Sequence, residues 1–217
     1  MEPDNIEINL IGTGGGYGES LVIHIGNDEW IVVDSCQNPK TGNSIPLEFL
    51  KQKSVDFNKV KLIVCTHWHD DHIRGIAALL DNCPKAIFSF ARATDLKKFL
   101  RLVSIDLQKS QYSVSNASTN EFNKCLDIVH ERNDIVKPSF TDRLLYSTTY
   151  NKKTIQIHSL SPSDLSSRLF DEEISTLISK FEKRNKKLPY QSPNDRSVVL
   201  LIQCGSHNIL LGSDLEI

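Results

Sequence analysis

The chain has 217 residues and a formal net charge of −2 at pH 7. This length is sufficient for one domain with a buried core, and the near-neutral charge excludes a global positive field, so any contact with nucleic acid would have to be local. No apolar stretch reaches the roughly 18 to 20 residues of a membrane-spanning helix, and no signal segment opens the chain. We therefore expect a cytoplasmic protein.

The first predicted strand, residues 6–11, ends in a glycine-rich stretch over residues 12–20. This stretch lacks the Lys-Ser/Thr of a phosphate-binding loop, and another strand follows it instead of a helix. We interpret it as a flexible turn that lets the backbone pass close to a functional site. Strands over residues 20–25 and 30–33 then flank a hairpin turn at residues 26–28.

A helix over residues 46–53 leads into a central apolar strand that begins at Val60 and ends in an unusual cluster, His67-Trp68-His69-Asp70-Asp71-His72. Burying so many ionisable side chains is costly unless a cation compensates. Imidazole and carboxylate groups suit zinc, and they also suit manganese or iron. His67 and His69 are two positions apart, so both rings can face one side, whereas Asp71 and His72 can approach a second ion. The alternative is a polar surface loop.

Downstream of the cluster, apolar spacing predicts alternating helices and strands. The order strand, helix, strand after the cluster favours an α/β layered sandwich. The five cysteines include no Cys-x-x-Cys pair, so we expect reduced and mostly buried thiols. The predicted elements are helices over residues 73–80, 94–107, 122–129 and 170–187, strands over residues 86–90, 154–160, 198–203 and 208–211, and a polar loop over residues 110–120.

The pattern His-x-His-x-Asp-His after an apolar strand resembles the metallo-β-lactamase superfamily of metallo-hydrolases. The resemblance implies an αββα sandwich. It also implies that Asp34, directly after the strand over residues 30–33, orients the metal-site loop without binding metal itself; a plain strand-end turn is the alternative reading. Many members place a third histidine for the first metal downstream, and His158 near a strand end fits this role better than His130 in a helical pattern.

The last stretch adds a second signal. Asn194-Asp195-Arg196-Ser197 precedes a strand, and a later strand ends in Gly212-Ser213-Asp214. This tail resembles the branch found in bacterial DNA-uptake competence proteins, in which the third histidine is often not kept, although Ser213 is inserted here between glycine and aspartate. The resemblance implies that Asp214 bridges two metal ions. Family members continue past this aspartate, so we expect residues 1–217 to form the amino-terminal part of a longer protein with a truncated second half.

The resemblance implies one or two zinc or manganese ions held by His67, His69, Asp71, His72 and Asp214. Asp71 is also the candidate proton acceptor. A nuclease is the first functional hypothesis, and the basic end of the helix over residues 170–187 could meet a phosphate backbone, although a solvated helix face explains it equally. The alternatives are ester, lactam or thioester hydrolysis, and a non-catalytic sensing or docking module of a larger multidomain protein, such as a bacterial defence protein.

Overall fold

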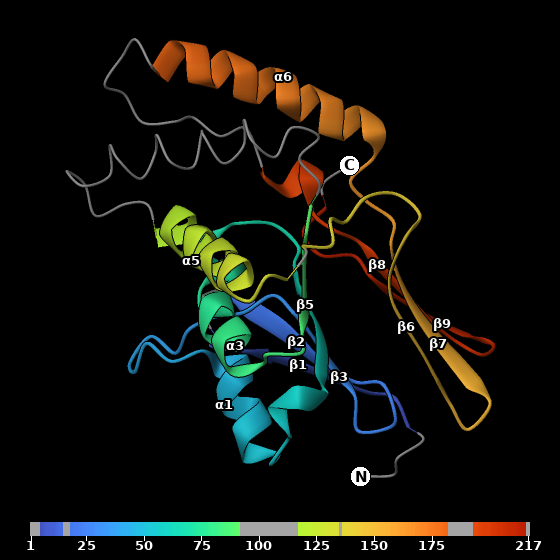
Figure 1. Ribbon diagram of the computed structural model, residues 1–217. Coiled ribbons are helices and arrows are strands. Elements are labelled where there is room, and N and C mark those ends of the chain that lie inside the picture. Colours follow the sequence, from blue (N-terminus) through green and yellow to red (C-terminus); the bar gives the residue numbers. More distant parts are fainter. Residues whose placement is uncertain (1–4, 15–17, 92–116, 135, 182–192, 216–217) are drawn as a thin grey trace.

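The computed structural model describes residues 5–14, 18–91, 117–134, 136–181 and 193–215. In these ranges, two sheets lie face to face and several helices cover the outer face of the first sheet (Figure 1). The full set of described helices is α1 (Ile45–Gln52), α2 (Asp70–Ile73), α3 (Ile76–Asn82), α5 (Ala117–Glu131) and α6 (Asp164–Phe181), with short 3-10 helices at Phe57–Lys59 and Pro193–Arg196.

The first sheet has five strands in the order β1-β2-β3-β4-β5. The strands are β1 (Glu7–Gly12), β2 (Glu19–His24), β3 (Trp30–Val33), β4 (Val60–Cys65) and β5 (Ile87–Phe90). The pairs β1–β2 and β2–β3 are antiparallel, whereas β3–β4 and β4–β5 are parallel. Because β3 and β4 run side by side in the same direction, their carboxyl ends, at Asp34 and Thr66, meet at one edge of the sheet.

The second sheet has four antiparallel strands in the order β6-β7-β8-β9. They are β6 (Arg143–Tyr150), β7 (Lys153–Ser159), β8 (Leu200–Cys204) and β9 (His207–Leu211). The sequence analysis did not predict β6, because most of its side chains are polar and only Leu145 is fully buried. The other three strands were predicted within about two residues of their observed limits.

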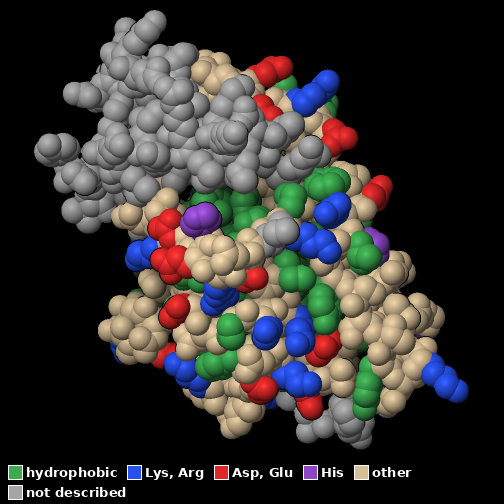
Figure 2. All heavy atoms as spheres, viewed as in Figure 1, with side chains coloured by type: hydrophobic (Ala, Val, Ile, Leu, Met, Phe, Trp, Pro, Cys, Tyr) green, Lys and Arg blue, Asp and Glu red, His purple; other side chains and the backbone are tan. Residues whose placement is uncertain are grey.

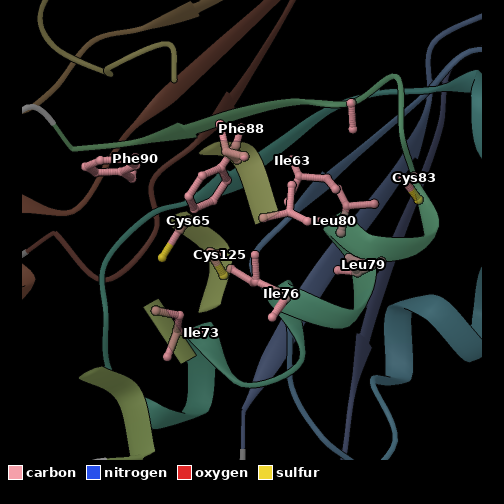
Figure 3. Close-up of a cluster of buried hydrophobic side chains, with 14 of the residues drawn as sticks. Ile63, Cys65, Ile73, Ile76, Leu79, Leu80, Cys83, Phe88, Phe90 and Cys125 are labelled. Carbon is pink, nitrogen blue, oxygen red and sulfur yellow. The ribbon is translucent and has the colours of Figure 1, made fainter. Parts of the chain in front are cut away.

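Strand β4 is apolar along its length because both of its faces are covered. Leu62 and Val64 point into a cluster shared with the second sheet, which includes Ile157 and Ile202. On the other face, Ile63 packs with side chains of α3 and α5 (Figure 3). Packing on both faces therefore fixes the position of the strand that leads to the histidine cluster.

The layered α/β sandwich expected from the sequence is confirmed, with corrections in its helical part. Helix α6 begins at Asp164, six residues before the predicted start at residue 170. The helix predicted over residues 73–80 is two helices, α2 and α3, separated by Arg74 and Gly75. Gly75 has a φ of +94°, and a β-carbon there would meet Ser44 and Ser35 at less than 3 Å. A helix cannot continue through this conformation, so the chain breaks directly after the cluster.

Some predicted features lie outside the described residues. These are the helix over residues 94–107, most of the polar loop over residues 110–120, and the basic residues 183–187. Within the described ranges, α5 begins at Ala117, inside the stretch predicted to be a loop. The five cysteines are all free thiols, and four are buried, as predicted. No helix of the described part of the chain is long and apolar enough to span a membrane.

Candidate metal centre

The predicted cluster forms at the carboxyl ends of β3 and β4. Asp34, His67 and His72 are buried, and each offers a ligand atom within 4.8 Å of the other two. The ring centroids of His67 and His72 are 4.2 Å apart, and those of His67 and His69 are 4.8 Å apart. The chain reaches this arrangement because residues 66–69 form a short connection after β4, extended at His69, and α2 then returns His72 toward the sheet.

Asp34 is the central hydrogen-bond acceptor of the cluster. Its Oδ1 accepts the backbone N–H of Thr66 at 2.7 Å, and its Oδ2 accepts the Thr66 hydroxyl at 2.6 Å and Nδ1 of His72 at 3.0 Å. Its backbone is left-handed, with a φ of +59°. A short carboxylate side chain tolerates this conformation better than most side chains do. These bonds fit the orienting role implied by the resemblance to the superfamily.

The same bonds fix which nitrogen of each imidazole carries the hydrogen. The Thr66 hydroxyl donates to Asp34, so at 2.9 Å it must accept a hydrogen from Nδ1 of His67. His72 likewise donates through Nδ1 to the carboxylate. Nε2 of each ring is therefore the atom left for a metal. Histidine ligands of metals typically donate their other ring N–H to a hydrogen-bond acceptor in this way. Sequence reasoning missed Thr66, whose only signal is its position directly before His67.

The electrostatics of the two histidines differ sharply. Burial, together with the neighbouring His72 and His69, lowers the pKa of His67 to about 3. Burial also acts to lower the pKa of His72, but the hydrogen bond to Asp34 and the charges of Asp34, Asp71 and Asp214 outweigh it and raise the pKa to about 9. Burial raises the pKa of Asp34 itself, and its bonds to His72 and Thr66 oppose that rise. His67 is therefore neutral at pH 7.

Asp214, 142 residues after His72 in sequence, lies directly opposite the cluster. Its Oδ2 is 3.3 Å from Nε2 of His72 and 3.9 Å from Nε2 of His67. Asp71 Oδ2 lies 3.8 Å from the same His72 atom. The structure thus places Asp71 and Asp214 beside His72, and Asp214 also lies near His67. The ring of His69 is next to that of His67.

Asp70, the remaining acid of the cluster, points elsewhere. Its carboxylate pairs with Arg74 and accepts the Ser118 hydroxyl at 2.6 Å. His130 is exposed on α5. His158 alternates with the inward-facing Ile157 on β7, so it lies on the side of the second sheet that faces away from the first. Neither His130 nor His158 joins the group of close ligand atoms found among the described residues.

Two backbone contacts hold the cluster in place. Gly18 has a φ of +107°, and a β-carbon there would collide with the carbonyl oxygen of Asp71. The described end of the glycine-rich stretch therefore passes close to the predicted ligands, as expected. From the other side, the Val198 N–H donates to the Thr66 carbonyl at 3.0 Å, and this bond ties the start of β8 to the end of β4.

A cavity of about 490 Å³ opens beside the cluster. Its lining includes Asp71, His72 and Asp214, together with Leu10 and Glu19. A second cavity of about 290 Å³ adjoins it and reaches Asp34 and Thr66. Three of the predicted ligands, Asp71, His72 and Asp214, therefore line a space that a substrate can enter.

The donor set fits a divalent metal ion. Nε2 of His67 is buried and has no hydrogen-bond partner among the described residues, although buried polar atoms normally have one. It lies 3.9 Å from the Asp214 carboxylate, and the ring of His72 is beside it; carboxylates and imidazoles are ligands of zinc and related ions. Cys65 is not part of this set, because its thiol donates to the His67 carbonyl at 3.2 Å and burial raises its pKa well above the ordinary value.

Comparison with known proteins gives matches in both sequence and structure. Ribonuclease Z of Borrelia hermsii is 26% identical over 73% of this chain and 46% of its own length, and ribonuclease Z of Borreliella burgdorferi is 24% identical over 67% and 42%. The chain thus spans less than half the length of these relatives. The metallo-beta-lactamase fold protein YhfI from Bacillus subtilis aligns with 96% of this chain and 61% of its own, at 15% identity and a TM-score of 0.43. The sequence profile of the metallo-beta-lactamase superfamily matches residues 13–142, and the chain belongs to that superfamily.

Proposed function

We propose that this domain is a metal-dependent hydrolase that cleaves phosphodiester bonds in RNA or DNA. The observation that carries the proposal is the convergence of Nε2 of His67, Nε2 of His72 and the Asp214 carboxylate at the wall of a cavity. The sequence similarity to ribonuclease Z supports nucleic acid as the substrate. The narrower resemblance to competence proteins, the cytoplasmic location and the place of residues 1–217 in a longer protein stay predictions.

The proposed ligands divide between two ions. His67 and His69 would hold the first, Asp71 and His72 the second, and Asp214 both; zinc, manganese and iron all suit this set. When bound, such ions lower the pKa of water and stabilise negative charge on the scissile group. Asp34 and Thr66 keep the two Nε2 atoms directed at the shared point, because they occupy both Nδ1 atoms.

When the first site alone is filled, Asp71 is the proposed proton acceptor. Its carboxylate is about half exposed, with a relative side-chain accessibility of 46%, so it is open to the cavity that it lines. His67 is a poorer candidate, because its pKa of about 3 leaves it too weakly basic to hold a proton at neutral pH. In this account Asp71 takes the proton at Oδ2 while His67 remains neutral throughout.

A second function is favoured by the walls of the two cavities. Their described lining residues include Leu10, Ile11 and Leu210 but no lysine or arginine. Figure 2 shows acidic and basic side chains interspersed over the described part of one face, without an extended basic field. An uncharged substrate, such as an ester, lactam or thioester with an apolar group, would suit these walls.

The test compares nucleic acid with small esters as substrates of the metal-loaded protein, in the wild type, Asp71→Asn and Asp70→Asn. We expect cleavage of RNA or DNA that weakens as salt increases, is lost in Asp71→Asn and persists in Asp70→Asn, because Asp70 pairs with Arg74. Hydrolysis of small esters without any cleavage of nucleic acid would refute the nuclease and favour the second function. No hydrolysis of either substrate class would favour a non-catalytic module.

A further inference from the structure

Trp68 stands between two proposed ligands, His67 and His69, and its ring joins an aromatic cluster on the helical side of the molecule. Its centroid is 5.6 Å from that of Phe170 in α6 and 6.3 Å from that of Phe122 in α5. Because His67, Trp68 and His69 are consecutive in the chain, the place of the Trp68 ring constrains the directions of both imidazoles. The packing of this ring is therefore coupled to the proposed metal centre.

Arg196 contacts both Trp68 and Phe170 from a buried position. Its guanidinium carbon lies 3.4 Å from the Phe170 ring centroid and 5.6 Å from that of Trp68, and 8% of the residue is exposed. Cations over aromatic faces are attracted more strongly when they are desolvated. Burial lowers the pKa of Arg196 to about 10, so the guanidinium remains charged at neutral pH.

The backbone after Arg196 is anchored to the same loop. Val198 donates its N–H to the Thr66 carbonyl at 3.0 Å, and the Ser161 hydroxyl bonds the Ser197 carbonyl. Arg196 thus approaches Trp68 from a segment whose backbone is hydrogen-bonded to Thr66, the residue directly before His67. The backbone of this segment therefore holds Thr66 and its side chain contacts Trp68, the two residues that flank His67.

We propose that Arg196 is a positioning residue of the metal centre: by holding Trp68 against Phe170 of α6, it keeps His67 and His69 aligned on one ion. This inference rests on the proposed metal-binding function. It assigns to α6 a role in metal affinity, although α6 contributes no proposed ligand.

The test is a titration of Arg196→Met with Co²⁺, monitored by absorption spectroscopy. Competition with a chelator gives the affinity, and thermal unfolding of the metal-free protein gives its stability. Methionine fills a similar volume without charge, so we expect an unfolding temperature at or above that of the wild type. We also expect binding about tenfold weaker and a changed Co²⁺ spectrum, by analogy with losses of outer residues at other metal sites. Arg168→Met is the control: Arg168 is an exposed arginine of α6, and its replacement should leave Co²⁺ binding like that of the wild type.

A purely structural arginine would change the unfolding temperature and leave the affinity and spectrum unchanged, and that result would overturn the inference. If Arg196→Met does not fold, Trp68→Phe and Trp68→Leu decide the matter. Phenylalanine keeps an aromatic face for Arg196 and should retain Co²⁺ binding, whereas leucine should weaken it about tenfold; equal binding would contradict the inference. A wild-type protein that binds no Co²⁺ would refute the metal centre itself, which is a separate outcome.

Discussion

Asp34 is buried, charged and left-handed in its backbone, and three hydrogen bonds converge on its carboxylate. Each feature alone is costly, since burial removes hydration from the charge and a positive φ strains most side chains. Together they have one effect, which is to direct two imidazole Nε2 atoms toward Asp214. At the scale of single residues, the centre is therefore organised by an acid that need not touch a metal.

Asp34→Asn tests this role. The amide nitrogen cannot accept a hydrogen bond, so either the Thr66 donors or His72 would lose a partner. We expect metal affinity to fall by about 10- to 100-fold, measured by competition with a chelator. Asp142→Asn is the matched control, because Asp142 is also left-handed, with a φ of +58°, but is exposed. Unchanged affinity in Asp34→Asn would show that the orientation of His72 does not depend on this carboxylate.

The two histidine pKa values predict how metal binding depends on pH. His72, with a pKa of about 9, carries a proton at pH 7 that must leave before Nε2 can bind a metal, whereas His67, with a pKa of about 3, has none to lose. Binding at pH 7 should therefore release about one proton from His72. Apparent affinity should rise about tenfold per pH unit up to pH 9 and then level off, apart from any contribution of metal hydrolysis.

Calorimetry in two buffers with different ionisation enthalpies counts the released protons. His72→Ala should lower the number released by about one, together with a loss of affinity. A wild-type protein that releases no proton at pH 7 would mean that His72 is neutral before the metal arrives, contrary to the charges that surround it.

At the residue scale, the sequence predicted those parts of the proposed centre that lie close together in the chain. His67, His69, Asp71 and His72 form a compact pattern, so their meeting was predictable from spacing. Asp214 was predictable only through a family resemblance, because its approach to His72 depends on how the two sheets pack. The roles of Thr66 and Arg196 could not be predicted from the sequence. Thr66 bonds Asp34 and Arg196 contacts Phe170, and both partners are distant in the chain.

At the scale of elements, the glycine-rich stretch between β1 and β2 sets how close the backbone comes to Asp71. Gly18→Ala should move Asp71 and weaken metal binding, because its β-carbon would collide with the Asp71 carbonyl oxygen. Gly14→Ala is the matched control, since Gly14 also has a positive φ, +71°, but no atom lies within 4 Å of an added β-carbon. The measurement is chelator competition on both variants; equal affinities would show that this contact does not position Asp71.

The elements that the sequence predicted best have strong periodic patterns. The limits of β4 and β7 follow from continuous or alternating apolar residues. Strand β6 was missed because pairing with β7 holds it, whereas its own side chains are mostly polar. The break at Gly75 was missed because a single glycine inside an apolar helical pattern is usually tolerated, and only the contacts with Ser35 and Ser44 require it here.

At the scale of the whole molecule, the proposed metal centre depends on the packing of two sheets, because its proposed ligands follow strands of both. Ile157 is fully buried in the cluster between the sheets, whereas Leu210 is 64% exposed. Ile157→Ala should destabilise the protein by about 2 to 5 kcal/mol, and Leu210→Ala by much less. Chemical denaturation measures both changes. Similar small losses would mean that the cluster between the sheets contributes little to stability, contrary to its burial.

The layered architecture could be predicted because strands and helices alternate around the cluster, and the superfamily match agrees with it. How the second sheet faces the first could not be derived from these patterns alone, because contacts such as the 2.9 Å bond from the Tyr146 hydroxyl to Glu29 join residues 117 positions apart. The same long-range packing brings Asp214 to the histidines.

The central claim, a metal-binding hydrolase centre, is tested most directly by metal content. The protein is purified without chelator, beside a His67→Ala, His69→Ala variant, and analysed by plasma mass spectrometry. We expect about one or two zinc, manganese or iron ions per wild-type chain, and a loss of metal in the variant while it remains folded. A wild-type chain that binds none of these metals, even after reconstitution with each, would contradict the account.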